Sequence, residues 1–201
     1  MGDTTRPIAI DLFAGVGGLS LGFEQAGFEV RAAVEIDPIH CLVHQFNFPQ
    51  TAVLCRSVAE ISGAAIREQA ALQQQEIDVV FGGSPCQGFS VMGKRALDDP
   101  RNALVKHFLR LVTELAPKYF VLENVKGLTL GPHRQFLAEA IAAFQERGYR
   151  VQENYQVLNA AHYGVPQNRE RLFLLGCRAD LPLPAYPQPP DSTHGRSEER
   201  R

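Results

Sequence analysis

The chain has 201 residues, of which 45% are hydrophobic and 21% are charged, which is typical of one water-soluble globular domain. No apolar stretch approaches the roughly 20 residues that cross a bilayer, and the first residues do not resemble a secretory signal. The four cysteines are widely spaced, which predicts reduced thiols in a cytoplasmic protein rather than a disulfide framework.

The net charge of −2 hides an uneven distribution along the chain. Residues 1–81 carry 4 basic and 10 acidic side chains, whereas residues 82–201 carry 16 basic and 12 acidic ones. An anionic partner is therefore expected to approach the second part of the chain.

Apolar runs rich in branched residues alternate with helical patterns through most of the sequence. Buried strands are predicted at 8–12, 29–36, 52–55, 77–83 and 118–125, and helices at 17–27, 38–46, 102–117 and 134–148. This alternation predicts an α/β fold with a doubly wound, mostly parallel sheet. The runs at 149–158 and 171–177 lack a clear helix between them and predict an antiparallel edge pair. The domain is expected to span 1–180, and the proline-rich tail at 181–201 is expected to be extended or disordered.

The first predicted strand runs into a glycine-rich turn that contains Gly15, Gly17 and Gly18. Ligands of doubly wound sheets bind beyond the carboxyl ends of the strands, so this turn is a candidate cofactor site. The pattern approximates the dinucleotide motif G-x-G-x-x-G, but Ser20 occupies the third glycine position. A turn with a purely structural role is the alternative.

Acidic residues beside this turn indicate which cofactor it would hold. Asp11 precedes the turn, together with Phe13, and a carboxylate there opposes a pyrophosphate but suits the ammonium and sulfonium groups of S-adenosylmethionine. Glu35 ends the next strand, where its two oxygens can accept both ribose hydroxyls. S-adenosylmethionine is therefore favoured over a nicotinamide or flavin cofactor.

The segment GGSPCQGFS, residues 82–90, places Cys86 in a turn after a buried strand, where packing does not explain a thiol. The next strand ends in Glu123, and the carboxyl ends of neighbouring parallel strands lie close together. A thiol beside a carboxylic acid can attack an electron-poor ring while the acid supplies a proton. The alternative is a turn in which the cysteine is incidental.

Arg169 and Arg171 alternate in the segment GVPQNRERLFLLG, so on a strand they point to the same face. Two guanidinium groups at one site suit a carbonyl oxygen or a phosphate, and they can lower the pKa of a nearby thiol. A solvated surface strand is the alternative.

Metal sites are not predicted. His40, Cys41 and His44 lie close together, but their segment is helical and has no second cluster, which favours packing and exposure over ligation. The zinc deaminases, a class of enzymes that act on cytosine or adenine, carry a P-C-x-x-C signature. That signature fails here because Phe89 stands at the position of the second cysteine.

The segments DLFAGVGGLSLGF, EID, GGSPCQGFS, ENV and GVPQNRERLFLLG follow one another in the order found in DNA (cytosine-5)-methyltransferases. The chain resembles that family over residues 8–178. The resemblance implies a Rossmann-like fold that binds S-adenosylmethionine, double-stranded DNA as partner and a role in restriction-modification. Cys86 would attack C6 of a flipped cytosine while Glu123 binds N3 and the exocyclic amine. Arg171 would hold the cytosine O2, and Arg169 would support the thiolate.

The resemblance also assigns the remaining contacts. The DNA-facing loop would carry Gln87 and Ser90, and the cofactor contacts would be Phe13, Gly15, Gly17, Gly18, Glu35, Ile36, Ser57, Val58, Pro85 and Leu104. Ser57 departs from the family because an acidic residue usually binds the adenine amine there.

The second departure is a target-recognition region, which the family carries and which these residues lack. A complementing subunit, a truncated product or a fragment would each account for this. An inactive cofactor-binding remnant and an RNA cytosine-5 methyltransferase are the alternative functions.

Overall fold

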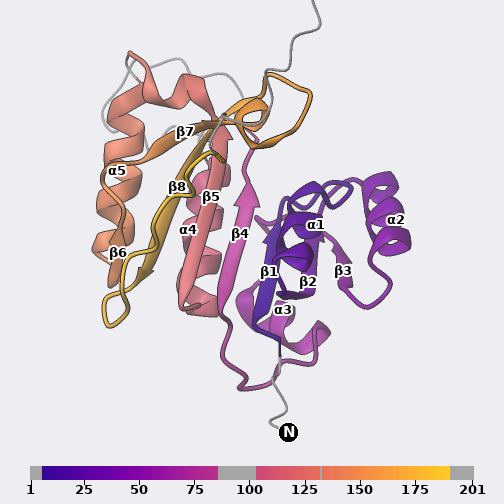
Figure 1. Cartoon of the computed structure of the whole chain (residues 1–201). Helices are drawn as coiled ribbons and strands as arrows, with labels where there is room; N and C mark the ends of the chain where they lie inside the picture. Colours follow the sequence, from indigo (N-terminus) through magenta and orange to yellow (C-terminus); the bar gives the residue numbers. More distant parts are fainter. Residues whose placement is uncertain (1–5, 86–102, 132, 191–201) are drawn as a thin grey trace, which may run out of the picture.

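The computed structural model describes residues 6–85, 103–131 and 133–190 of the chain. Its strands form one eight-stranded sheet in the order β3-β2-β1-β4-β5-β8-β6, with β7 paired to β8 (Figure 1). The strands are β1 (Ile8–Leu12), β2 (Glu29–Glu35), β3 (Ala52–Cys55), β4 (Val79–Gly83), β5 (Tyr119–Val125), β6 (Tyr149–Val151), β7 (Gln156–Asn159) and β8 (Glu170–Arg178). The pairs among β1 to β5 are all parallel, which confirms the doubly wound sheet.

Helices cover both faces of this sheet, with α1 and α2 on one face and α4 on the other (Figure 1). The α-helices are α1 (Gly18–Gln25), α2 (Pro38–Asn47), α3 (Gly63–Gln69), α4 (Ala103–Leu115) and α5 (His133–Gln145). Two short 3-10 helices are also present, η3 (Lys126–Thr129) and η4 (Ala160–Tyr163). The expected helices are present. Helix α3 was not predicted from the sequence, although Ser62 caps its N-terminus by accepting a hydrogen bond from the amide of Ala65.

The main core lies between the sheet and the helices α4 and α5. Apolar side chains at three- and four-residue spacing on α4 are buried there, as the helical pattern predicts. Phe120 of β5 stacks on Phe144 of α5 with ring centroids 4.1 Å apart, and Phe108 of α4 meets both rings edge-on. This packing fixes the position of β5, and therefore of the residues at its carboxyl end.

The order of the sheet reverses at β1, which has β2 on one side and β4 on the other. In doubly wound sheets, the crevice for a ligand opens beyond the carboxyl ends of the strands at this switch point. Leu12 of β1 pairs with Gly82 of β4, and Gly83 pairs with Glu123 of β5. The glycine-rich turn and the predicted acid are thus brought to one edge of the sheet.

The antiparallel part of the sheet differs from the expectation in one respect. The run at 149–158 forms two strands, β6 and β7, because residues 152–155 bend out of the ladder. Both pair antiparallel with β8, which itself pairs antiparallel with β5. The antiparallel pair is therefore present at this edge of the sheet, with β8 next to β5 and β6 outermost.

Residues 181–190 form no helix or strand, as expected, but they pack against the domain. Tyr186 is buried, and its hydroxyl donates a hydrogen bond of 2.7 Å to the carbonyl of Phe173 in β8. The Tyr163 hydroxyl likewise donates to the carbonyl of Pro187 at 3.0 Å. The expected tail beyond residue 190 lies outside the described residues.

Among the described residues, no helix is long and apolar enough to cross a membrane. Helix α2 nevertheless exposes four apolar side chains at helical spacing, which we call the apolar face of α2: Ile39, Leu42, Val43 and Phe46. Phe46 is the most accessible of these four side chains, with 86% of its surface exposed.

Candidate active site

A cavity of about 570 Å³ opens at the carboxyl ends of β1, β2, β3 and β4. Its volume is within the range of sites for small molecules and cofactors. Eight of the ten residues predicted to bind the cofactor line it: Phe13, Gly15, Glu35, Ile36, Ser57, Val58, Pro85 and Leu104. The cavity has five further lining residues that were not predicted from the sequence: Val34, His40, Arg56, Gly83 and Ala103.

Glu35 is held in place by the backbone around it. Its Oε2 accepts a hydrogen bond of 2.8 Å from the amide of Gly15, and its Oε1 accepts one of 2.9 Å from the amide of Asp37. Each carboxylate oxygen keeps a further lone pair, so the group can still accept two hydroxyl hydrogen bonds. The carboxylate is therefore preorganised at the cavity wall, where a ribose would fit.

The turn after β1 has an unusual backbone. Phe13 has a φ of 62° and Gly15 a φ of 53°. Left-handed backbone is uncommon for an aromatic residue and tends to persist at functional sites, where the surrounding structure holds it. The turn thereby brings both residues to the cavity.

Gly17 and Gly18, which were also predicted to bind the cofactor, do not line this cavity. Gly17 caps α1 with a φ of 98°, and a Cβ on it would lie 2.2 Å from the Phe48 ring. Gly18 lines a second cavity. Their contact with a cofactor remains a prediction.

Asp11 does not face the cofactor cavity, contrary to the expectation. Its side chain is fully buried beneath the turn, where it accepts a hydrogen bond of 2.7 Å from the Ser20 hydroxyl. Ser20 Oγ lies 3.1 Å from Nε2 of His44, which is also buried. Burial raises the pKa of Asp11 to about 7, against the lowering effect of Ser20. Asp11 therefore stabilises the turn from inside instead of meeting a ligand.

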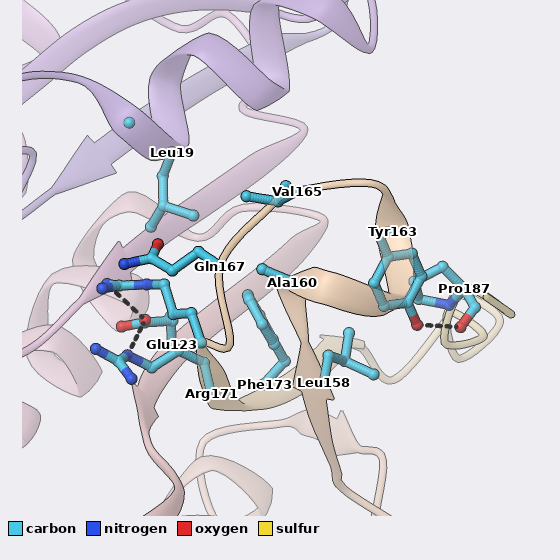
Figure 2. A pocket seen from close by; sticks show the side chains of 12 residues that line it. Leu19, Glu123, Leu158, Ala160, Tyr163, Val165, Gln167, Arg171, Phe173 and Pro187 are labelled. Carbon is cyan, nitrogen blue, oxygen red and sulfur yellow. Dashed lines mark hydrogen bonds and ion pairs between the residues drawn. The ribbon is translucent and has the colours of Figure 1, made fainter. Parts of the chain in front are cut away.

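A second cavity, of about 660 Å³, opens at the carboxyl end of β5, where Glu123 lines it (Figure 2). One side of this cavity is polar and is made by Glu123, Gln167, Arg169 and Arg171. The opposite side is apolar and is made by Leu158, Ala160, Tyr163, Phe173 and Pro187 (Figure 2). A planar ring with polar edges would match these two sides.

Glu123 is the centre of the polar side. Its Oε1 lies 3.0 Å from Nε of Arg171 (Figure 2). The same oxygen lies 3.8 Å from Nη2 of Arg169, so the structure brings together Glu123 and both arginines. Desolvation by burial raises the pKa of Glu123, and the nearby charges of Arg171 and Arg169 lower it by less. A carboxyl group with a raised pKa is suited to donate a proton.

Neighbouring hydrogen bonds orient this cluster. Oδ1 of Asn159 accepts a bond of 3.1 Å from the amide of Arg169, and Lys126 Nζ lies 2.8 Å from Oε1 of Glu170. The buried amide of Asn124 donates to the carbonyl and hydroxyl oxygens of Ser84 at 3.2 and 3.1 Å, which ties the end of β4 to β5. The contacts of Asn124 with Ser84 and of Lys126 with Glu170 were not predicted from the sequence, because they join residues 40 and 44 positions apart.

Cys86, Gln87 and Ser90 lie outside the described residues. Pro85, immediately before Cys86, is described and lines the first cavity. Within the described segments, no group of three or more His, Cys, Asp and Glu side chains is arranged to hold a metal ion, and Cys41 and His44 are buried.

Comparison with known proteins gives consistent matches. A family model described as C-5 cytosine-specific DNA methylase matches residues 8–200. The type II methyltransferase M.XorII of Xanthomonas oryzae pv. oryzae is 65% identical over 94% of this chain, which spans only 45% of that protein. The type II methyltransferase M.AquIA of a Picosynechococcus species is 44% identical over 96% of this chain and 79% of its own length.

Solved structures agree with the family match. A crystal structure of a prophage-encoded DNA modification methyltransferase from E. coli has a TM-score of 0.73 and 38% identity, covering 86% of this chain and 47% of that one. Spodoptera frugiperda DNMT2 has a TM-score of 0.66 and 26% identity, covering 87% and 51%.

Proposed function

Because the chain belongs to the C-5 cytosine-specific DNA methylase family, we propose that it is the part of a methyltransferase that methylates C5 of cytosine in double-stranded DNA. The observation that carries the proposal is the Glu123 cluster beside a cavity suited to a nucleoside cofactor. The chain spans 45% of M.XorII and 79% of M.AquIA, and the complete enzyme is proposed to include a target-recognition region besides these residues.

The first cavity fits S-adenosylmethionine. Glu35 would hold the ribose hydroxyls, Phe13 and Gly15 would surround the adjoining part of the molecule, and Ser57 would accept a hydrogen bond from the adenine amine. The remaining contacts would come from Ile36, Val58, Pro85 and Leu104. When bound, S-adenosylmethionine supplies an electrophilic methyl group.

The second cavity would hold the cytosine, which must leave the duplex to be reached. Arg171 would donate to the cytosine O2, and Glu123 would donate a proton to N3. The raised pKa of Glu123 supports this role, because it favours the protonated form of the acid.

Cys86 would be the nucleophile. Its thiolate would form a bond to C6 while the proton from Glu123 reaches N3, and Arg169 would stabilise the thiolate. The electron pair thus made available at C5 would form a bond to the methyl carbon while the bond between that carbon and the sulfonium breaks, which would leave S-adenosylhomocysteine. Loss of the C5 proton to a base, cleavage of the bond between sulfur and C6 and return of the N3 proton to Glu123 would then release 5-methylcytosine and regenerate the thiolate and the acid.

DNA with 5-fluorocytosine at the target tests this proposal. Fluorine cannot leave C5 as a proton does, so the complete or reconstituted enzyme should stay covalently attached after methyl transfer. Cys86→Ser should abolish the adduct, and Glu123→Gln should slow its formation while cofactor binding persists. An adduct that survives Cys86→Ser would assign the attack to another residue.

Absence of any adduct with the restored enzyme would favour a remnant that binds cofactor without turnover. An adduct on RNA that is absent on DNA would favour the RNA enzyme.

A further inference from the structure

Two consecutive glycines end β4, and the second of them stands between the two cavities. Gly83 lines the first cavity and pairs in register with Glu123, which lines the second. Paired residues on adjacent parallel strands project from the same face of the sheet. The space that a side chain of residue 83 would take is therefore the space beside the Glu123 carboxyl group.

The Glu123 carboxyl group fills that space. A Cβ on Gly83 would lie 2.7 Å from Oε2 of Glu123 and 3.6 Å from its Cδ, the first of which is closer than real Cβ contacts allow. The other carboxylate oxygen, Oε1, is 3.0 Å from Arg171 Nε. The carboxyl group is thus enclosed between the bare backbone of β4 and the arginine of β8.

We propose that Gly83 is a positioning residue, whose missing side chain keeps the Glu123 acid against β4 at the boundary of the two cavities. The role in catalysis rests on the proposed function, whereas the placement of the acid does not. Even an alanine at residue 83 would push the carboxyl group away from β4, out of its buried position.

The neighbouring glycine has a different role. A Cβ on Gly82 would lie 2.2 Å from the backbone oxygen of Leu12, inside the sheet. A backbone atom in a parallel ladder cannot move aside, whereas the end of a glutamate side chain can. Gly82→Ala is therefore expected to disturb the fold. Gly83→Ala is expected to keep the fold intact and to displace the Glu123 carboxyl group.

The first test uses this chain alone, without substrate. Gly83→Ala should melt close to the parent protein, and the pKa of Glu123, followed by NMR of its side-chain carboxyl carbon, should fall. It falls because burial is the main cause of the raised value and the displaced group gains water. Gly22→Ala in α1 is the control, since a Cβ on Gly22 would meet nothing within 4 Å beyond its own helix and Gly22 lines neither cavity.

An unchanged Glu123 pKa in a folded Gly83→Ala protein overturns the proposal, and so does an equal change in Gly22→Ala. If Gly83→Ala does not fold, the residue is a structural glycine like Gly82 and the proposal is also wrong. None of these outcomes depends on methyltransferase activity.

The second test uses the complete enzyme and its turnover on DNA. Gly83→Ala should lower the turnover number by at least ~100-fold, the scale of one lost acid catalyst, with a much smaller change in cofactor affinity. Glu123→Asp is shorter by one methylene and removes the clash, so it should cost activity in the parent but cost none, or restore some, in Gly83→Ala. Losses that simply multiply in the double variant, or a fully active Gly83→Ala, overturn the proposal.

Discussion

Nε of Arg171 lies 3.0 Å from Oε1 of Glu123, and it reaches that carboxylate from a strand that runs antiparallel to the strand of the acid. Val125 of β5 pairs with Arg171 of β8, so the start of one strand meets the end of the other. The antiparallel register therefore places a cation at the same edge of the sheet as the carboxyl ends of the parallel strands.

Replacing Arg171 by Gln should raise the pKa of Glu123 further, because the charge of Arg171 lowers this pKa more than the charge of Arg169 does. NMR titration of the Glu123 carboxyl carbon measures this shift. Arg178→Gln is the matched control, because Arg178 is an arginine of the same strand that pairs with Glu76. A fall of the Glu123 pKa in Arg171→Gln would contradict the geometry of this pair.

Replacing Glu35 by Gln should weaken binding of S-adenosylmethionine by about 10-fold or more, because hydrogen bonds to a charged group contribute about 1.5–3 kcal/mol. Gln keeps the size of the side chain and one acceptor oxygen, so the turn at Gly15 should survive. Calorimetric titration of this chain measures the affinity, with Glu29→Gln on the same strand as the control. Equal affinities for the parent and Glu35→Gln would refute the ribose contact.

Replacing Ser57 by Asp should strengthen cofactor binding by about 1 kcal/mol, if a charged acceptor replaces a hydroxyl at the adenine amine. Ser57 lines the cavity and is partly exposed, so the larger side chain has room. Calorimetric titration of this chain with S-adenosylmethionine measures the change in affinity. Unchanged or weaker binding would mean that Ser57 does not meet the adenine amine.

Asp11 should make the protein less stable as the pH rises. Its pKa is raised from 3.8 to about 7 by burial, so the folded state holds the proton more tightly than the unfolded state. The stabilisation is complete below about pH 4 and is lost as the pH rises to about 7, by at most about 4 kcal/mol. His44 acts in the opposite sense, because burial lowers its pKa and its protonation at low pH opposes folding.

Asp11→Asn should remove the dependence that Asp11 causes, since an amide mimics the protonated acid and Ser20 can still donate to it. Urea unfolding at several pH values measures the free energy of unfolding. His44→Gln is the companion variant, and it should steepen the loss of stability with rising pH. A parent protein and Asp11→Asn with the same pH profile would show that Asp11 is ionised in the folded state.

The apolar face of α2 should make this chain prone to association at high concentration, because contiguous exposed apolar side chains are aggregation sites or interfaces. Phe46→Ser should therefore lower the binding of a hydrophobic dye and the light scattering of concentrated samples. Leu130→Ser is the control, since Leu130 is 57% exposed but lies outside the apolar face of α2. A larger effect from Leu130→Ser would point to a different surface.

Much of the fold could be predicted because each parallel strand is a short apolar run that ends in a turn. Alternation predicted that Arg169 and Arg171 share a face, whereas their meeting with Glu123 was implied by the resemblance to the family. The pairing of β8 with β5 could not be predicted, because its register depends on residues about fifty positions away. Asp11 was misplaced for a related reason: its partners Ser20 and His44 become neighbours only when α1 and α2 pack on the sheet.

The place of β8 also sets the order in which the chain can mature on the ribosome. β5 leaves the exit tunnel before residues 126–169, and until β8 follows them one edge of β5 keeps unpaired N–H and C=O groups. Such an edge is a template for pairing with other nascent chains. The aromatic packing of Phe120 against Phe144 can form before β8 arrives, so the half-built sheet has a covered face while its edge is still open. Slow translation of the segment that leads to β8 would prolong this exposed stage, and chaperone dependence should be greatest there.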